Sequence, residues 1–279
     1  MPSLFDVANH FDDIPITDGY TGAALYSGQF SSFLEASPDG STAQRRTLSL
    51  APGLVIPARR VLTALTERWI VGMGNLDGIY GQAIRQSFWT KKVTDTFQIL
   101  TPAQAALAQS GVTAYGHREY LKDTINLFTD AQYDPFWDIY FSNTEPVFKG
   151  TFLKSGTTLY RARSLHTGKE GLFDASCDEL DIGAGVAVVF PQTGAYSPHT
   201  DSYAAGSVTT TGILLDRYKL FEYRTEADAK TAAGDMSLVV AQSVVTPKVG
   251  WAVTIAAQPW RVEAVTPELD GYLLHVRRA

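Results

Sequence analysis

The histidines and carboxylates are the first side chains in this sequence that could do acid–base or metal chemistry. Five histidines are spread along the chain, and none is paired with another at the spacing of metal ligands. The best cluster is His199 with Asp201, in a stretch from 192 to 211 that is rich in Gly, Ser and Thr. A metal there would need further ligands from elsewhere in the fold. A solvated loop is the simpler interpretation, so we predict no metal site.

Acidic residues beside aromatic ones form a second pattern. Asp77, Asp134, Asp138 and Glu145 lie near Tyr, Trp or Phe, as acids do in sugar-binding sites. Two carboxylates that act on a glycosidic bond meet only in the fold, so a sugar site stays open at this point. Asp77 is more simply a turn residue, and the other three are more simply surface acids.

Motifs for a nucleophile or for phosphate binding are missing from the sequence. It contains no G-x-S-x-G elbow and no glycine-rich phosphate loop, and Gly183-Ala-Gly185 lacks the third glycine. Cys177 is the single cysteine, which excludes a disulfide within the chain and a CxxC redox pair. We therefore predict no catalytic, metal-binding or cofactor-binding residue, no cofactor, and a protein that is not an enzyme.

Basic residues occur in four doublets. Adjacent residues on a strand point to opposite faces, so a doublet does not by itself make a basic patch. We expect them to be solvated or paired with acids, with a position around a DNA passage as the alternative. The doublets are Arg45-Arg46, Arg59-Arg60, Lys91-Lys92 and Arg277-Arg278.

The composition is that of a soluble globular protein. The chain has 279 residues, of which 45% are hydrophobic and 19% charged, with a net charge of −6. That charge argues against a protein that coats nucleic acid. The first residues lack a basic and apolar leader, and the longest apolar run, 182–190, is too short to span a bilayer. We expect a chain made in the cytoplasm, with no membrane partner.

The elements that would position any site are mainly strands, most clearly in the stretch from 247 to 278. Apolar residues recur there at every second position through Trp251, Val253 and Ile255. Such alternation is typical of strands that bury one face. Leu269-Asp270-Gly271 is a tight turn signal, so the pattern predicts three short antiparallel strands at the end of the chain.

This closing unit has a second copy in the sequence. Leu48 matches Leu238, Pro57 matches Pro247 and Trp69 matches Trp260 at nearly constant offsets, and Asp77-Gly78 matches Asp270-Gly271. A fainter third copy runs from 156 to 172. A true duplication and the loose self-similarity of any β-rich chain both explain these matches.

The expected fold is mainly β, with barrel or sandwich modules, an apparent duplication, and a few short helices in an inserted middle segment. Helical spacing follows Ser3, spans 102–109 and 117–128, and begins again at Thr225. We expect an N-terminal barrel-like module with a leading helix at 1–90. An inserted mixed α/β segment with an exposed, mobile loop (192–211) follows at 91–235, and the closing β unit at 236–279.

The closing unit resembles the small β-barrels of tailed-bacteriophage head-closure or head–tail joining proteins, the stopper or neck proteins. The resemblance rests on Lys248-Val-Gly250, Trp260-Arg-Val262, Leu269-Asp-Gly271 and the final strand Tyr272-Leu-Leu-His-Val-Arg277. It covers about the last 35 residues well, and similar patterns occur in other small barrels. This chain departs from the family in size, because such proteins are commonly little more than one barrel.

The resemblance implies a structural virion protein. Copies would form a cyclic ring in the neck, as head closure or tail terminator, around the DNA channel and next to packaged DNA. The portal or adaptor and the tail proteins would be its partners. The alternative, from a different class, is a glycan-active or carbohydrate-binding tail protein that uses the aromatic segment 133–141.

Overall fold

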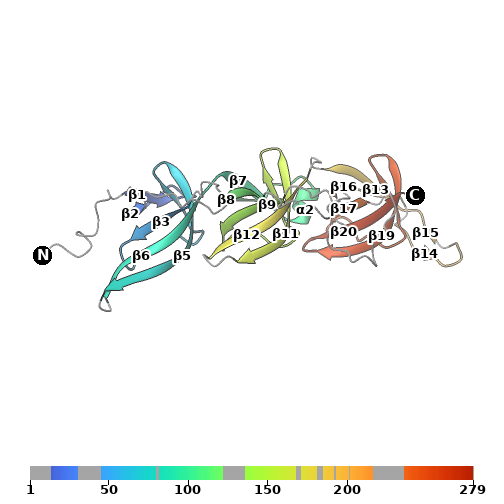
Figure 1. The fold of residues 1–279 in the computed structure, drawn as a ribbon. Coiled ribbons are helices and arrows are strands. Elements are labelled where there is room, and N and C mark those ends of the chain that lie inside the picture. Colours follow the sequence, from blue (N-terminus) through green and yellow to red (C-terminus); the bar gives the residue numbers. More distant parts are fainter. Residues whose placement is uncertain are drawn as a thin grey trace, which may run out of the picture.

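The computed structural model describes residues 14–30, 45–79, 82–121, 136–167, 171–180, 185–191, 193–200, 202–215 and 236–278. These residues form three closed antiparallel barrels of six strands each, arranged in a row (Figure 1). Closure pairs every strand of a barrel on both sides, so none of these three sheets has a free edge. The expectation of a mainly β fold built from barrel modules is confirmed.

The first barrel contains six strands in the spatial order β1-β2-β3-β6-β5-β4, and it closes where β4 pairs with β1. The strands are β1 (Ile14–Asp18), β2 (Ala24–Phe30), β3 (Arg45–Leu50), β4 (Val61–Ala64), β5 (Glu67–Ile79) and β6 (Gln82–Lys92).

The second and third barrels repeat this strand order, since each runs one-two-three-six-five-four around the barrel. The second consists of β7 (Asp95–Leu100), β8 (Val112–Leu121), β9 (Phe136–Ser142), β10 (Phe152–Ser155), β11 (Thr158–Thr167) and β12 (Leu172–Leu180). The third consists of β13 (Val186–Phe190), β16 (Val208–Leu215), β17 (Met236–Ala241), β18 (Ala252–Ile255), β19 (Gln258–Glu268) and β20 (Gly271–Arg278).

The register shows that the three barrels agree residue by residue. Leu62 pairs with Trp69, Leu153 with Tyr160 and Val253 with Trp260, which places an aromatic ring at the same position of strand five each time. A β-bulge follows two residues later in all three barrels, after Val71, Ala162 and Val262. Two-residue turns join strands four and five, and these hairpins lie along the same side of the row (Figure 1). The three barrels therefore have the same orientation.

The apparent duplication is thus a threefold repeat of the architecture. Leu48 and Leu238 do occupy equivalent positions, as do Trp69 and Trp260. The match of Asp77-Gly78 with Asp270-Gly271 is wrong, because β5 runs on through Asp77, whose backbone pairs with Arg85. The turn expected at Asp77 therefore lies inside a strand. Ladder hydrogen bonds outweigh the local preference of Asp-Gly for a turn.

Each barrel has an apolar interior built from alternate residues of its strands. Leu48, Ile139 and Leu238 are fully buried at the same position of strand three. In the closing strands Trp251, Val253 and Ile255 are buried, as their alternation predicted. The three closing strands expected from the sequence are β18, β19 and β20.

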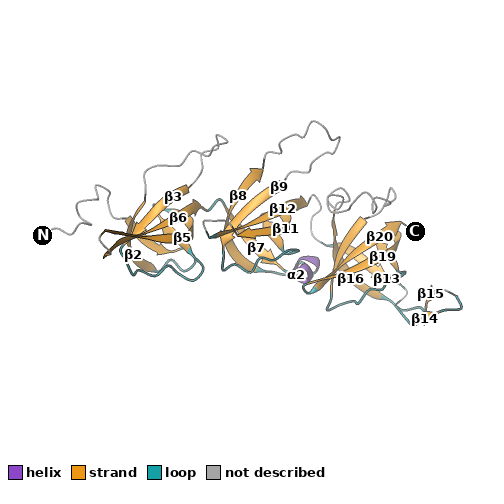
Figure 2. Cartoon of the chain, turned by 60° about the horizontal axis from the view of Figure 1, so that its bottom comes forward, coloured by secondary structure: helices purple, strands orange, loops and turns teal. Residues whose placement is uncertain are grey.

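The expectation of several short helices in the middle of the chain is not confirmed. Among the described residues the helix there is α2 (Pro102–Ala106), which lies between the second and third barrels (Figure 2). Thr101 caps it with a capping box, as its Ala/Gln-rich sequence allows. The helix predicted from His117 is wrong as far as Leu121, because β8 continues there with Ala114 and Gly116 inside the barrel. The helices predicted near Ser3 and after Thr225, and residues 122–128, lie outside the described residues.

The segment expected as an insertion, 91–235, contains all of the second barrel and two strands of the third. The closing unit, 236–279, supplies the other four strands of the third barrel. The stretch expected to be a mobile loop (192–211) contains a small hairpin of β14 (Tyr196–Ser197) and β15 (Ser202–Tyr203), followed by the start of β16.

Candidate functional site

Those residues considered for chemistry that the structure describes are not brought together by the fold. His199 is exposed in the turn of the β14–β15 hairpin, and its neighbour Asp201 lies outside the described residues, as does Asp134. Asp138 accepts a hydrogen bond of 2.8 Å from Ser176, whereas Glu145 lies in the contact with the first barrel. Nothing in this placement makes a pair of carboxylates around a common substrate.

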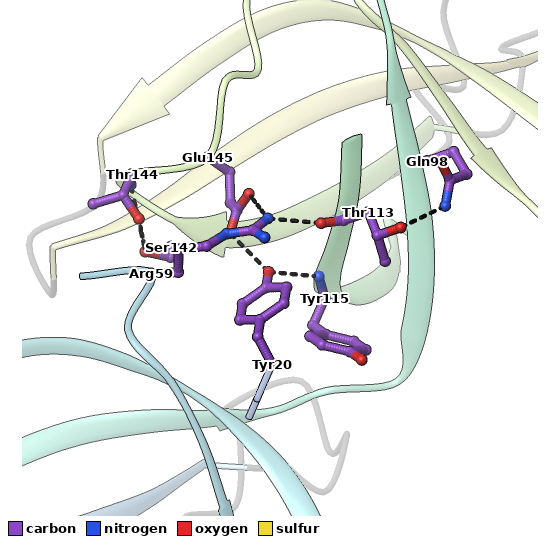
Figure 3. Close-up of polar contacts among 8 residues, drawn as sticks. All are labelled: Tyr20, Arg59, Gln98, Thr113, Tyr115, Ser142, Thr144 and Glu145. Atoms are coloured by element: carbon purple, nitrogen blue, oxygen red, sulfur yellow. Dashed lines mark hydrogen bonds and ion pairs between the residues drawn. The ribbon is translucent and has the colours of Figure 1, made fainter. Parts of the chain in front are cut away.

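The polar groups that the fold does assemble lie at the junction of the first and second barrels (Figure 3). Arg59 donates two hydrogen bonds to the Glu145 carboxylate, from Nε at 3.0 Å and from Nη2 at 2.5 Å. The Tyr20 hydroxyl donates to the same carboxylate at 2.8 Å. It also accepts from the backbone N–H of Tyr115 at 3.2 Å. These contacts tie two loops of the first barrel to two elements of the second.

Aromatic stacking adds to this junction. The Arg59 guanidinium lies 3.7 Å from the centre of the Tyr20 ring, and the Tyr20 and Tyr115 rings are 4.7 Å apart. Arg68 covers the Tyr115 ring at 4.4 Å. Cation–π contacts strengthen when they are shielded from water. These residues therefore form a specific polar contact between two barrels, which we call the polar lock.

Burial sets the protonation of this lock. The side chain of Glu145 is fully buried, while that of Arg59 is 37% exposed. Burial and the hydrogen bond to Glu145 raise the pKa of Tyr20 well above its usual range. For Arg59, burial lowers the pKa, but the hydrogen bond to Glu145 and the electrostatic interactions with Tyr20, Glu145 and Tyr115 together outweigh it, so the net shift is upward. The tyrosine therefore stays neutral and the arginine stays charged at neutral pH.

Lys91 forms a second contact across the same junction. Its side chain is almost fully buried, with Nζ 2.7 Å from Glu119 and 3.2 Å from the centre of the Tyr140 ring. His117 places Nε2 3.0 Å from Glu119 and donates from Nδ1 to the Lys92 carbonyl at 2.6 Å. Burial alone would raise the pKa of Glu119, but His117 and Lys91 lower it to about 2.

The junction of the second and third barrels is mainly apolar. A cluster of buried side chains fills it, and α2 packs against β16, β17 and β20. Three polar contacts frame the cluster. Arg161 binds both carboxylate oxygens of Glu268, at 2.5 and 2.7 Å. The backbone N–H of Ala103 donates to Asp270 at 3.0 Å. The Thr211 hydroxyl donates to the Ala106 carbonyl at 2.5 Å. The buried cluster is Leu100, Ala105, Phe152, Leu159, Leu180, Ile213, Leu215 and Val239.

Sequence reasoning missed these junctions. The doublets Arg59-Arg60 and Lys91-Lys92 were expected to be solvated or paired with acids at the surface. Arg59 and Lys91 do pair with acids, but each pair bridges two barrels. Arg161, in the stretch noted only as a fainter third copy, pairs with a residue 107 positions away. Nothing local in the sequence marks these pairs. Once three barrels are known, a charged residue that lies next to the linker between two of them indicates a contact across the junction.

An aromatic cluster lies elsewhere on the second barrel. Trp137 donates to Glu179 at 2.7 Å and contacts Tyr120 edge-on, with ring centres 5.2 Å apart. Arg118 lies over the Trp137 ring at 4.8 Å, and Tyr120 is 54% exposed. Trp137 belongs to the segment expected for a sugar site (133–141), whereas Tyr120 and Glu179 come from other strands of the same barrel.

Within the described ranges, no three His, Cys, Asp or Glu side chains lie close enough to hold a metal ion. No helix in that same part of the chain is long and apolar enough to cross a membrane.

Comparisons with family models, with curated proteins and with solved structures find no match to this chain. The described ionisable groups at the two junctions bind one another. What the arrangement does chemically is to hold three barrels in a fixed order.

Proposed function

We propose that this protein is a structural virion protein of a tailed phage, which forms part of the head–tail connector or neck as a head-closure or tail-terminator ring around the DNA channel. The observation that carries the proposal is the row of three barrels with one strand order and one orientation, joined by buried contacts. Such a row offers repeated rigid surfaces to neighbours. The resemblance of the closing strands to head-closure barrels gives the proposal its place in the virion.

The junctions support a mechanical role. A neck protein must keep its shape while DNA under pressure passes it, so its modules need to be fixed to one another. Buried apolar area and shielded ion pairs at two successive junctions supply that stiffness. In this proposal the portal or adaptor lies on one side of the ring and tail proteins on the other. The net charge of −6 lets packaged DNA pass without being held.

Depletion of the protein during infection tests this role. An amber mutation in its gene, grown in a non-suppressing host, should yield filled or leaking heads and separate tails by electron microscopy. Suppression should restore complete particles. Normal, infectious particles without the protein would contradict the proposal.

The aromatic cluster around Trp137 supports a second candidate, a carbohydrate-binding tail protein. Stacked Trp and Tyr rings beside an acid are the ordinary means of holding a sugar, and here Tyr120 is exposed and Glu179 is adjacent. Titration of a single-tryptophan variant that retains Trp137 with a glycan panel tests it. A saturable fluorescence change, lost in Tyr120→Ala, would favour this function, and no response to any glycan would retire it.

A further inference from the structure

The connection between strands one and two plays the same part in the first two barrels. In the first barrel this connection carries Tyr20, which reaches onto the second barrel at Tyr115 and Glu145. In the second barrel it carries α2, which packs against β16, β17 and β20 of the third barrel. The first and the second barrel therefore each contact the next barrel through the connection between their strands one and two.

The position that is contacted is also equivalent in the second and third barrels. Phe97 pairs with Ala114 and Val188 with Thr210, so the next residues along strand two, Tyr115 and Thr211, correspond to each other. Tyr115 binds the hydroxyl of Tyr20, and Thr211 donates to the carbonyl of Ala106 in α2. The same position on strand two thus contacts the preceding barrel in both the second and the third barrel.

The third barrel carries the same kind of element, the β14–β15 hairpin. Figure 1 shows it beyond the third barrel, on the side away from the second, and no described residue lies further along the row. The hairpin is anchored, because Tyr203 packs edge-on against Trp251 with ring centres 5.8 Å apart. Tyr196 contacts the Tyr203 ring and is 50% exposed. An anchored arm that carries a half-exposed tyrosine corresponds to the connection that carries Tyr20.

The first barrel presents the matching position. Ile16 pairs with Tyr26 as Phe97 does with Ala114, so Ser27 on β2 is equivalent to Tyr115 and Thr211. Ser27 is exposed on the outer face of the barrel, and Leu25 beside it is 38% exposed. No described residue of another barrel covers this face.

We infer that the β14–β15 hairpin of one copy docks on the β2 face of the first barrel of a second copy, around Ser27. This contact between copies repeats the arrangement of the two junctions within the chain. The barrel that is contacted has the same strand order in all three cases. Such a head-to-tail contact is heterologous, so it generates a ring when the rotation closes and a filament when it does not. The inference rests on the proposed assembly function and names the surfaces through which copies meet.

Sedimentation velocity of the full chain over a concentration series tests this contact. The wild type should associate with rising concentration. Tyr196→Ser, which removes the arm's exposed ring, and Ser27→Arg, which blocks the face, should each weaken association at least tenfold. Phe148→Ser, at an aromatic 55% exposed on the β9–β10 connection, is the matched control and should associate like the wild type. Both substituted residues are exposed, and unchanged circular dichroism and melting will show that the variants fold.

A mixture of the two variants gives the sharpest result. Ser27→Arg keeps an intact arm and Tyr196→Ser keeps an intact face, so mixing them should yield one-to-one dimers and nothing larger. A wild type that stays monomeric, variants that associate normally, or a mixture without dimers would each overturn the inference. If the protein is still present in particles in that case, the contact is wrong and the virion role stands.

Discussion

Arg59 of the first barrel and Glu145 of the second form a two-point ion pair whose carboxylate is fully buried. The Tyr20 hydroxyl binds the same carboxylate. Two loops that are distant in the sequence thus depend on one acid, and the relative position of the two barrels depends on it too. The stability of the row should therefore respond to this pair more than to ion pairs within one barrel.

Glu145→Gln should destabilise the junction by about 2 kcal/mol, because hydrogen bonds to charged groups contribute roughly 1.5–3 kcal/mol and Arg59 is partly solvated. Urea unfolding followed by tryptophan fluorescence should show the first barrel unfolding earlier than the other two. Glu67→Gln, which breaks the half-exposed pair with Lys92 inside the first barrel, is the control and should cost below about 1 kcal/mol. Equal losses in the two variants would contradict the special role of Glu145.

Ile213→Asp should loosen the second junction. Ile213 is 1% exposed in the cluster between the second and third barrels, and the side chains that pack with it in that cluster are apolar. A charge placed in an apolar contact costs several kcal/mol, about as much as the contact contributes. Small-angle scattering should then show a larger radius of gyration while circular dichroism keeps its β signal. An unchanged radius would show that the framing polar contacts suffice.

Glu119→Gln should reveal a pH-dependent contribution from the Lys91 contact. The pKa of Glu119 is lowered to about 2, so its stabilisation is complete above the unfolded value near 4.5 and disappears as the pH falls toward 2. The variant should lose roughly 1–2 kcal/mol at pH 7, since this carboxylate is 38% exposed, and should match the wild type only below about pH 2, where the carboxyl is protonated in the folded chain too. A difference that is independent of pH would contradict this account.

Asp138→Asn should stabilise the fold at pH 7, whereas Glu119→Gln destabilises it. Burial raises the pKa of Asp138, and the neighbouring Asp174 raises it further, although Ser176 opposes the shift. A raised carboxyl pKa means that the ionised form destabilises the fold above that pKa, and protonation relieves the cost as the pH falls. The variant should be more stable than the wild type at pH 7, with the gain vanishing in acid. Thermal melts at a series of pH values will check it.

The β4–β5 hairpin offers a stabilising change. Leu65 and Thr66 both have positive φ, at 53° and 66°, although side chains other than Gly and Asn disfavour that region. Replacing them with Asn-Gly, the preferred pair for this turn, should stabilise the chain by about 1 kcal/mol and raise the melting temperature by about 2 °C. The neighbouring β10–β11 turn already has Gly156 at φ 58°, so Gly156→Ala is the matched destabilising change.

The sequence predicted the parts of the fold that depend on local alternation. Trp251, Val253 and Ile255 face the interior as expected, and Trp69 and Trp260 occupy equivalent positions. The second barrel was harder to see because its equivalent of these tryptophans is Tyr160, in a strand of different composition. A threefold repeat whose members share packing but few identities leaves little trace in a single sequence.

The junctions could not be predicted, for a physical reason. Arg59 and Glu145 lie 86 residues apart and meet only after both barrels have closed. A basic doublet looks the same whether it is solvated or buried against another barrel. The helix expected from His117 failed similarly, since spacing along the chain cannot show that β7 and β9 flank that segment.

The most direct test of the proposed role is a count of copies in the virion. Quantitative mass spectrometry of purified phage particles, with the major capsid protein as the internal standard, gives that number. The account predicts a few copies per particle, as a ring at one vertex requires. Complete absence from particles would contradict it, and hundreds of copies would move the protein from the neck to the shell or the tail tube.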